Sequence, residues 1–83
     1  MILINYFARY REQLDLGGEK LPLTADLKTI EDVRRLLMAR GESWREVLGE
    51  SNLMCALNQE LCQTDQVIED FDEIAFFPPV TGG

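Results

Sequence analysis

The chain ends in FFPPVTGG, and the group with the clearest chemistry is the carboxylate of its last residue, Gly83. Gly82 and Gly83 carry no side chains, so they could pass through a narrow slot in another protein and leave the carboxylate open to attack. A carboxylate is a poor electrophile, but as an acyl adenylate it accepts a nucleophile such as sulfide and becomes a thiocarboxylate. The sequence therefore predicts a terminus that another enzyme activates and loads.

The residues before this terminus would hold it away from the domain. Pro78 and Pro79 lack amide hydrogens and fix φ near about −65°, so they end a strand and continue as an extended chain. Residues 78–83 would reach at most roughly 20 Å. Gly-Gly alone would indicate only a disordered end. An apolar strand, a stiff Pro-Pro exit and a C-terminal Gly-Gly together favour a functional tail.

Other side chains offer little chemistry. The chain has no histidine, and its two cysteines, Cys55 and Cys62, are too few for an iron–sulfur cluster and lack the Cys-x-x-Cys spacing. We interpret them as reduced core or near-core residues, with a disulfide between them as the alternative. Four acidic residues lack the spacing of a calcium loop and are interpreted as a solvated turn: Glu69, Asp70, Asp72 and Glu73. We expect no metal site and no bound cofactor, and a stand-alone enzyme is the least favoured reading.

Composition limits the class of protein. The chain has 83 residues, a net charge of −7 and 46% hydrophobic residues, which predicts one domain with a thin core. The acidic excess disfavours nucleic acid and anionic membranes as partners and suits docking on a basic protein surface. Met1 leads directly into an apolar strand pattern without a basic signal region, and no apolar run is long enough to cross a bilayer. These features predict a cytoplasmic protein.

The N-terminal third is predicted to be strand, helix and strand. MILINYFA alternates and is apolar on both faces, which predicts a central strand. RYREQLDL predicts a helix of about two turns that would end at Gly17-Gly18. EKLPLT predicts an edge strand with Leu21 and Leu23 facing inward, because Pro22 has no amide to donate to a neighbouring strand.

The clearest helix begins at Thr29, an N-cap residue with Asp32 three positions later. Its apolar residues recur at helical spacing: Ile30, Val33, Leu36 and Leu37. Gly41 would end it. Ser43 and Glu46 form a second capping box, which would open a short helix. Three apolar residues would pin that helix to the core: Trp44, Val47 and Leu48.

The remaining segments predict strands. LMCALNQELC predicts a hairpin that turns at Asn58-Gln59, and EIAFF predicts the final strand. Because the first and last strands are the most apolar, the economical solution places them parallel at the centre of one mixed sheet, with the long helix across one face. The predicted fold class is α+β, a β-grasp (ubiquitin-like) roll, with a domain at 1–77 and an extended tail at 78–83.

The run DEIAFFPPVTGG resembles the C-terminus of the small, sulfur-carrying subunits of molybdopterin synthase. The resemblance extends to FARYRE, TIEDVRRLL and ALNQEL, and to the spacing between the hairpin and the tail. It implies that an E1-like enzyme uses ATP to adenylate Gly83 and that a sulfur donor then forms a thiocarboxylate. The tail would enter the large synthase subunit and deliver sulfur to a pyranopterin precursor. A 2+2 heterotetramer is implied, with the catalytic side chains in the large subunit and this chain as a co-substrate.

The resemblance also implies site residues. Gly83 is the site of adenylation and thiocarboxylate formation. The tail residues that would insert into the partner are Pro78, Pro79, Val80, Thr81 and Gly82. Phe7, Leu61 and Phe77 match apolar positions that line the contact surface for both partners, with an ordinary core role as the alternative. Arg11 matches a position that meets an acidic partner group or holds the base of the tail.

Two positions near the last strand test this picture. Strand alternation places Phe76 and Phe77 on opposite faces, and we predict that Phe77 faces outward. The family usually has Asp-Gly-Asp-Glu where this chain has Asp70-Phe71-Asp72-Glu73. A glycine there indicates positive φ, so either the turn is reshaped or Phe71 packs where glycine could not.

Two other functions fit the same tail. One is a protein modifier that is conjugated to lysines after the same activation. The other is a binding module whose tail only docks.

Overall fold

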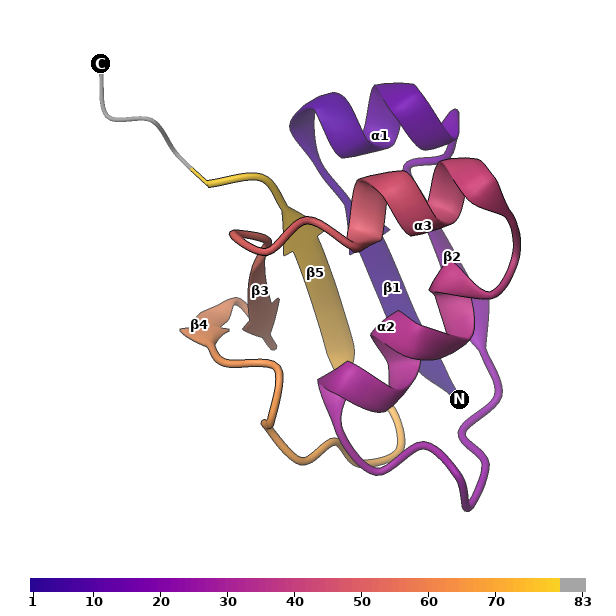
Figure 1. Cartoon of the computed structure of the whole chain (residues 1–83). Coiled ribbons are helices and arrows are strands. Elements are labelled where there is room, and N and C mark those ends of the chain that lie inside the picture. The colour runs from indigo at the N-terminus through magenta and orange to yellow at the C-terminus, as the bar shows by residue number, and fades with distance from the viewer. Residues whose placement is uncertain (80–83) are drawn as a thin grey trace.

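The computed structural model describes residues 1–79, which form one five-stranded sheet with three helices (Figure 1). In chain order the elements are β1 (Ile2–Tyr6), α1 (Ala8–Leu14), β2 (Gly18–Leu21), α2 (Ile30–Met38), α3 (Glu42–Leu48), β3 (Met54–Leu57), β4 (Glu60–Cys62) and β5 (Glu73–Phe77). Residues 80–83, which hold most of the predicted tail, lie outside the described part of the chain.

The strand order is β2-β1-β5-β3-β4. β1 and β5 are parallel, and the other neighbouring strands are antiparallel. In Figure 1, α2 and α3 lie across one face of the sheet, and α1 lies at the end of the sheet where β1 and β5 finish. This is the β-grasp arrangement with the first and last strands paired at the centre, so the predicted fold class is confirmed.

Strand alternation divides the residues of β1 and β5 between two faces. The row that faces the helices is fully buried: Ile2, Ile4, Tyr6, Ile74 and Phe76. The helices cover it with a second set of buried residues: Ile30, Val33, Leu37, Val47 and Leu48. Fully burying one such aliphatic side chain contributes about 1.5–3 kcal/mol, so this layer is a major source of stability for the domain.

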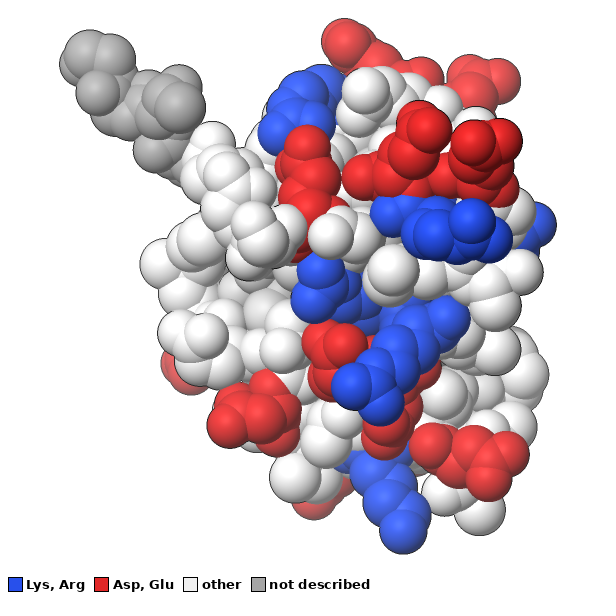
Figure 2. All heavy atoms as spheres, viewed as in Figure 1, with Lys and Arg blue, Asp and Glu red and all other residues white. Residues whose placement is uncertain are grey.

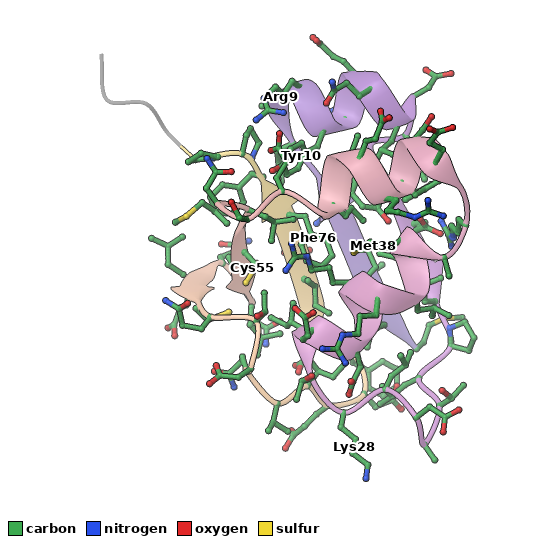
Figure 3. The ribbon with its side chains drawn as sticks, in the orientation of Figure 1. Arg9, Tyr10, Lys28, Met38, Cys55 and Phe76 are labelled. Atoms are coloured by element: carbon green, nitrogen blue, oxygen red, sulfur yellow. The ribbon has the colours of Figure 1, made fainter. Side chains whose placement is uncertain are left out.

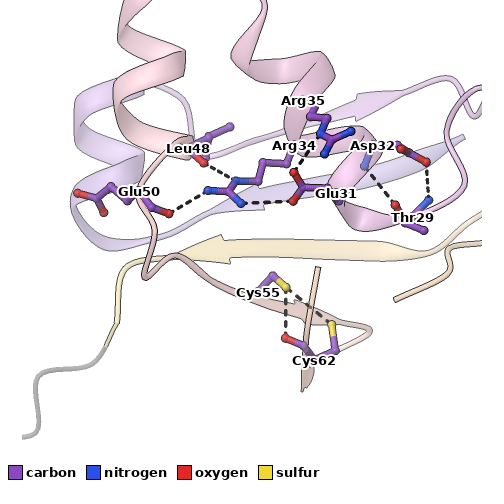
Figure 4. A network of polar contacts seen from close by, with 9 residues as sticks. All are labelled: Thr29, Glu31, Asp32, Arg34, Arg35, Leu48, Glu50, Cys55 and Cys62. Carbon is purple, nitrogen blue, oxygen red and sulfur yellow. Dashed lines mark hydrogen bonds and ion pairs between the residues drawn. The ribbon is translucent and has the colours of Figure 1, made fainter. Parts of the chain in front are cut away.

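α2 begins with the predicted capping box (Figure 4). The Thr29 Oγ1 accepts a bond from the Asp32 amide at 3.2 Å, and the Asp32 Oδ2 accepts one from the Thr29 amide at 3.1 Å. Leu36 shares the helical spacing of the buried residues, but its side chain is 49% exposed. The apolar stripe that α2 buries passes through Ile30, Val33 and Leu37, and Leu36 lies at its margin.

α1 and β2 differ from the prediction at their ends. α1 ends at Leu14 rather than at the glycine pair, because Asp15 adopts the left-handed conformation (φ 52°) and caps the helix. Gly18 is instead the first residue of β2. β2 is an edge strand as predicted, but it ends at Leu21, before Pro22.

The predicted capping box at Ser43 is also wrong. α3 begins at Glu42, with Gly41 as its N-cap. The Arg45 amide donates to the Gly41 carbonyl at 3.0 Å, so the helical ladder starts before Ser43, which lies inside the first turn. Trp44 is half-buried, and Val47 and Leu48 are buried, as predicted.

Two turns contain residues with positive φ. Asn58 and Gln59 join β3 to β4 with φ values of 50° and 71°, which confirms the predicted hairpin turn. Phe71 keeps positive φ (73°) and is 82% exposed, so the turn has not been reshaped and the ring is not buried. The Phe71 amide donates to the Met1 carbonyl at 2.7 Å, which ties this turn to the start of β1.

Candidate functional site

The sheet face opposite α2 and α3 carries a groove of about 550 Å³. Its lining comes from four strands, from the β3–β4 turn and from the residues that follow β1 and β5: Asn5, Phe7, Ala8, Ala56, Gln59, Leu61, Glu73, Ala75, Phe77 and Pro78. Of these described lining residues, only Glu73 is ionisable. The groove is therefore suited to binding an apolar surface and offers no acid–base pair for catalysis.

Small residues make the floor of the groove. The register places Ala56 of β3 opposite Ala75 of β5 on one side and opposite Leu61 of β4 on the other. Two alanines at adjacent positions of neighbouring strands leave a depression between the larger side chains around them.

Exposed apolar side chains form the rim. Phe7 is 47% exposed and Leu61 is 69% exposed. Phe77 is half-buried on this face, whereas Phe76 is fully buried on the helix face, so the predicted orientation of the two rings is confirmed. The structure thus brings together Phe7, Leu61 and Phe77, the three apolar residues that the sequence placed in a contact surface. A cluster of exposed apolar residues of this kind is typical of a protein-binding site.

Hydrogen bonds from α1 fix one side of the groove. Tyr10 donates to Glu50 Oε1 at 2.6 Å, and both guanidinium nitrogens of Arg9 bond the same carboxylate. Burial, with help from the hydrogen bond to Glu50, raises the pKa of Tyr10 far above its usual range. The Phe7 amide donates to the Phe76 carbonyl at 3.2 Å. The Phe7 side of the rim is therefore held by α1 and β5 together.

Asn58 fixes the opposite side. Its amide donates to the Glu73 carbonyl at 2.8 Å, and its side-chain Oδ1 accepts from the Glu73 amide at 3.0 Å. Its Nδ2 also donates to Asp72 at 3.0 Å. The β3–β4 hairpin, which carries Leu61, is thus clamped to the start of β5.

The chain leaves the sheet at the groove. Pro78 follows the last residue of β5 and belongs to the lining. The predicted roles of Val80, Thr81, Gly82 and Gly83 lie outside the described residues. Charged side chains gather over the helix-bearing face in Figure 2, which contrasts with the mostly apolar groove on the other face.

Arg11 lies apart from the groove. It lines a separate hollow beside the end of α1, with Asp15 and Gly17 among its neighbours. Its guanidinium covers Gly17, where an added Cβ would come within 3.2 Å of Cζ. The two hollows share Ala8, so Arg11 neighbours the groove without lining it.

The other chemistry-bearing side chains of the described residues are tied up in local contacts. Within residues 1–79, no group of three His, Cys, Asp or Glu side chains is placed to hold an ion. Asp70 pairs with the N-terminal amine, and Asp72 Oδ2 accepts from the Glu69 amide at 2.7 Å. None of the helices described here is long and apolar enough to span a membrane.

Comparison with known proteins identifies the family of the chain. A model of the ThiS family matches residues 4–83. The chain belongs to the ThiS family. Within that family, it is 40% identical to the molybdopterin synthase sulfur carrier subunit of Escherichia coli (strain K12), over 83 residues that cover 100% of both chains. The resemblance that the sequence indicated is therefore confirmed.

Solved structures support the fold of this ThiS-family chain. SAMP1 from Haloferax volcanii, a small archaeal modifier protein, superposes with a TM-score of 0.79 at 23% identity, covering 99% of this chain and 98% of that one. A Helicobacter pylori complex of subunits 1 and 2 of molybdopterin-converting factor contains a chain that matches with a TM-score of 0.68 at 23% identity, covering 99% and 97%. At these identities the likeness shows the β-grasp fold.

Sequence reasoning missed the floor of this ThiS-family groove. Ala56, Ala75 and Glu73 were assigned to strands, and Glu73 also to a solvated turn, but none of them was assigned to a contact surface. The alternation that placed Phe77 outward also places Ala75 on the same face, so that signal was present in EIAFF. The contribution of Ala56 required the register between β3 and β5, which the sequence did not provide.

Proposed function

We propose that this chain is a sulfur carrier for molybdopterin synthesis and that the C-terminal carboxyl group of Gly83 carries the sulfur. The observation that carries the proposal is the 40% identity to a molybdopterin synthase sulfur carrier subunit over the full length of both chains. The apolar groove beside Pro78 agrees with it, because a carrier needs a docking surface next to its working end.

The chemistry would proceed in two steps on other proteins. An E1-like enzyme would adenylate the Gly83 carboxylate with ATP and release pyrophosphate, and a sulfur donor would then displace AMP to leave a thiocarboxylate. In the large synthase subunit, that sulfur would pass to the pyranopterin precursor, and Gly83 would return to a carboxylate. The chain supplies binding and delivery, which fits a groove whose described lining has one ionisable side chain.

Docking would use the groove for both partners in turn. Phe7, Leu61 and Phe77 would bury their exposed surface against the activating enzyme and then against the large subunit. The Helicobacter pylori neighbour is a complex of subunits 1 and 2 of molybdopterin-converting factor, which supports a large-subunit partner for this chain. A 2+2 heterotetramer and a cytoplasmic location are part of this proposal.

Intact mass spectrometry tests the chemistry. The purified full chain is incubated with the activating enzyme, ATP and sulfide, and the expected mass gain is one sulfur minus one oxygen, located in the C-terminal peptide at Gly83. Omitting ATP is the control and should abolish the gain.

Variants at the terminus separate this function from its alternatives. Deleting Gly83, or adding one residue after it, should abolish sulfur transfer to the precursor by the large subunit. Full transfer by either variant would contradict the proposal. Lysine-linked adducts recovered from cells would instead indicate a protein modifier, and tolerance of Gly83→Ala with no ATP-dependent mass change would indicate a binding module.

A further inference from the structure

The β3–β4 hairpin places the two cysteines opposite each other. Cys55 and Cys62 are register partners, and their Sγ atoms lie 3.9 Å apart (Figure 4). Both are free thiols, and the Cys55 thiol also donates to the Cys62 carbonyl at 3.3 Å. In Figure 3, Cys55 lies beside Phe76, its register partner on β5, so the pair sits on the helix-facing side of the sheet.

The backbone geometry of this pair is compatible with a disulfide. Leu57 and Glu60 flank the two-residue turn, and pairing alternates along the hairpin, so Cys55 and Cys62 occupy a hydrogen-bonded position. The Cα atoms at such a position are about 5.5 Å apart, within the range of roughly 4.4–6.8 Å found for disulfides. Because a disulfide bond is about 2.05 Å long, the sulfurs need to approach by about 2 Å through side-chain rotation.

The two thiols differ in their access to solvent. Cys55 is 2% exposed, and burial, followed by the neighbouring Cys62, raises the pKa of its thiol to about 12. Cys62 is half-buried on β4, one of the two edge strands of the sheet. An oxidant that arrives from solvent therefore meets Cys62 first.

We propose that Cys55 and Cys62 form a reversible thiol–disulfide site that reacts with small disulfides such as oxidised glutathione. The Cys62 thiolate attacks one sulfur of the small disulfide, which forms a mixed disulfide and releases one small thiolate. Cys55 then attacks the Cys62 sulfur and passes its proton to the departing thiolate, which leaves as the second small thiol. The small disulfide is thereby reduced to two thiols, and the cysteine pair is oxidised with the loss of two hydrogens.

The position of the pair makes the bond easy to reverse. Directly opposed Cβ atoms are farther apart at a hydrogen-bonded position than a disulfide prefers, and strained disulfides are reduced readily. The bond would also tie the edge strand to β3 directly behind Ala56 and Leu61, the neighbouring register pair that faces the groove. This site is independent of the sulfur-carrier proposal, because neither step uses Gly83.

Thiol mapping of the full chain tests the site. Reduced protein is incubated with oxidised glutathione, quenched with acid, alkylated and weighed intact without reductant. The wild type is expected to lose two hydrogens and both alkylation sites, to retain no glutathione and to regain both thiols in dithiothreitol. Cys55→Ala should stop at one glutathione on Cys62, whereas Cys62→Ala should gain none, because its remaining thiol is buried.

Three results would overturn the proposal. The wild type could stop at a stable glutathione adduct, it could keep both thiols under conditions that modify Cys55→Ala, or it could form disulfide-linked dimers instead of an internal bond. Circular dichroism checks the fold of each variant, and if Cys55→Ala is unfolded, wild type that keeps both thiols in excess oxidised glutathione overturns the proposal by itself.

Discussion

Replacing Leu61 with alanine tests whether the groove is the docking surface. Leu61 is 69% exposed, so about two thirds of its surface remains available for burial by a partner. Burying a whole leucine contributes about 1.5–3 kcal/mol, and two thirds of that is about 1–2 kcal/mol. The dissociation constant for the large synthase subunit should therefore rise roughly 5- to 30-fold.

Leu36→Ala is the matched control. Leu36 is also an exposed leucine, at 49%, but it lies on α2, on the opposite side of the sheet from the groove. Isothermal titration calorimetry of both variants against the large subunit should show a loss for Leu61→Ala alone. Urea unfolding should give both variants nearly the stability of the wild type, because neither side chain belongs to the buried core. Equal losses of affinity, or no loss for Leu61→Ala, would refute the docking assignment.

Three further predictions concern the domain itself. Phe71→Gly should stabilise the domain by about 0.5–1 kcal/mol in urea unfolding, because it relieves positive φ at a side chain that is 82% exposed; a loss of stability would contradict this. Hydrogen bonding to Arg40 lowers the pKa of Glu19, so the stability that this carboxylate contributes is present above about pH 4.5 and is lost as the pH falls through its lower folded value. The stability difference between wild type and Glu19→Gln should thus shrink on acidification, and a constant difference from pH 7 to pH 3 would oppose the assignment. Thr29→Ala should cost about 1 kcal/mol through loss of the cap on α2, whereas Thr24→Ala, at an exposed loop position, should cost little; equal effects would rule out capping as the cause.

The sequence predicted the central architecture because its strongest patterns agreed with one another. The alternation in MILINYFA and EIAFF predicted the parallel central pair β1 and β5, and the Thr29–Asp32 pair predicted the start of α2. Asn58 predicted a turn of the correct length, since its backbone tolerates positive φ.

Some predictions failed where more than one nearby residue could begin or end a helix. Asp15 ends α1 in a left-handed conformation before the glycines are reached, and Gly41 starts α3 two residues before the expected serine. Leu36 fits helical spacing, but the width of the buried stripe depends on how α2 packs against its neighbours. Such choices depend on tertiary contacts that a single sequence does not reveal.

The candidate site was predicted only in part for the same reason. Phe7, Leu61 and Phe77 followed from the family resemblance, and the structure places them around one groove. The groove itself exists because Ala56 and Ala75 are neighbours across two strands. That pairing depends on the order and register of strands that are distant in sequence.

The pairing of β1 with β5 also determines when the protein can fold. Leu3 is the register partner of Glu73, and β5 is the neighbour of β3 as well, so both halves of the sheet wait for residues 73–77. On the ribosome, the segments made earlier have no central strand to pair with, and interactions between distant parts of a chain form slowly. A truncated chain that lacks β5 would therefore fail to fold. Only chains that include residues 73–77 would fold and be able to bind partner proteins.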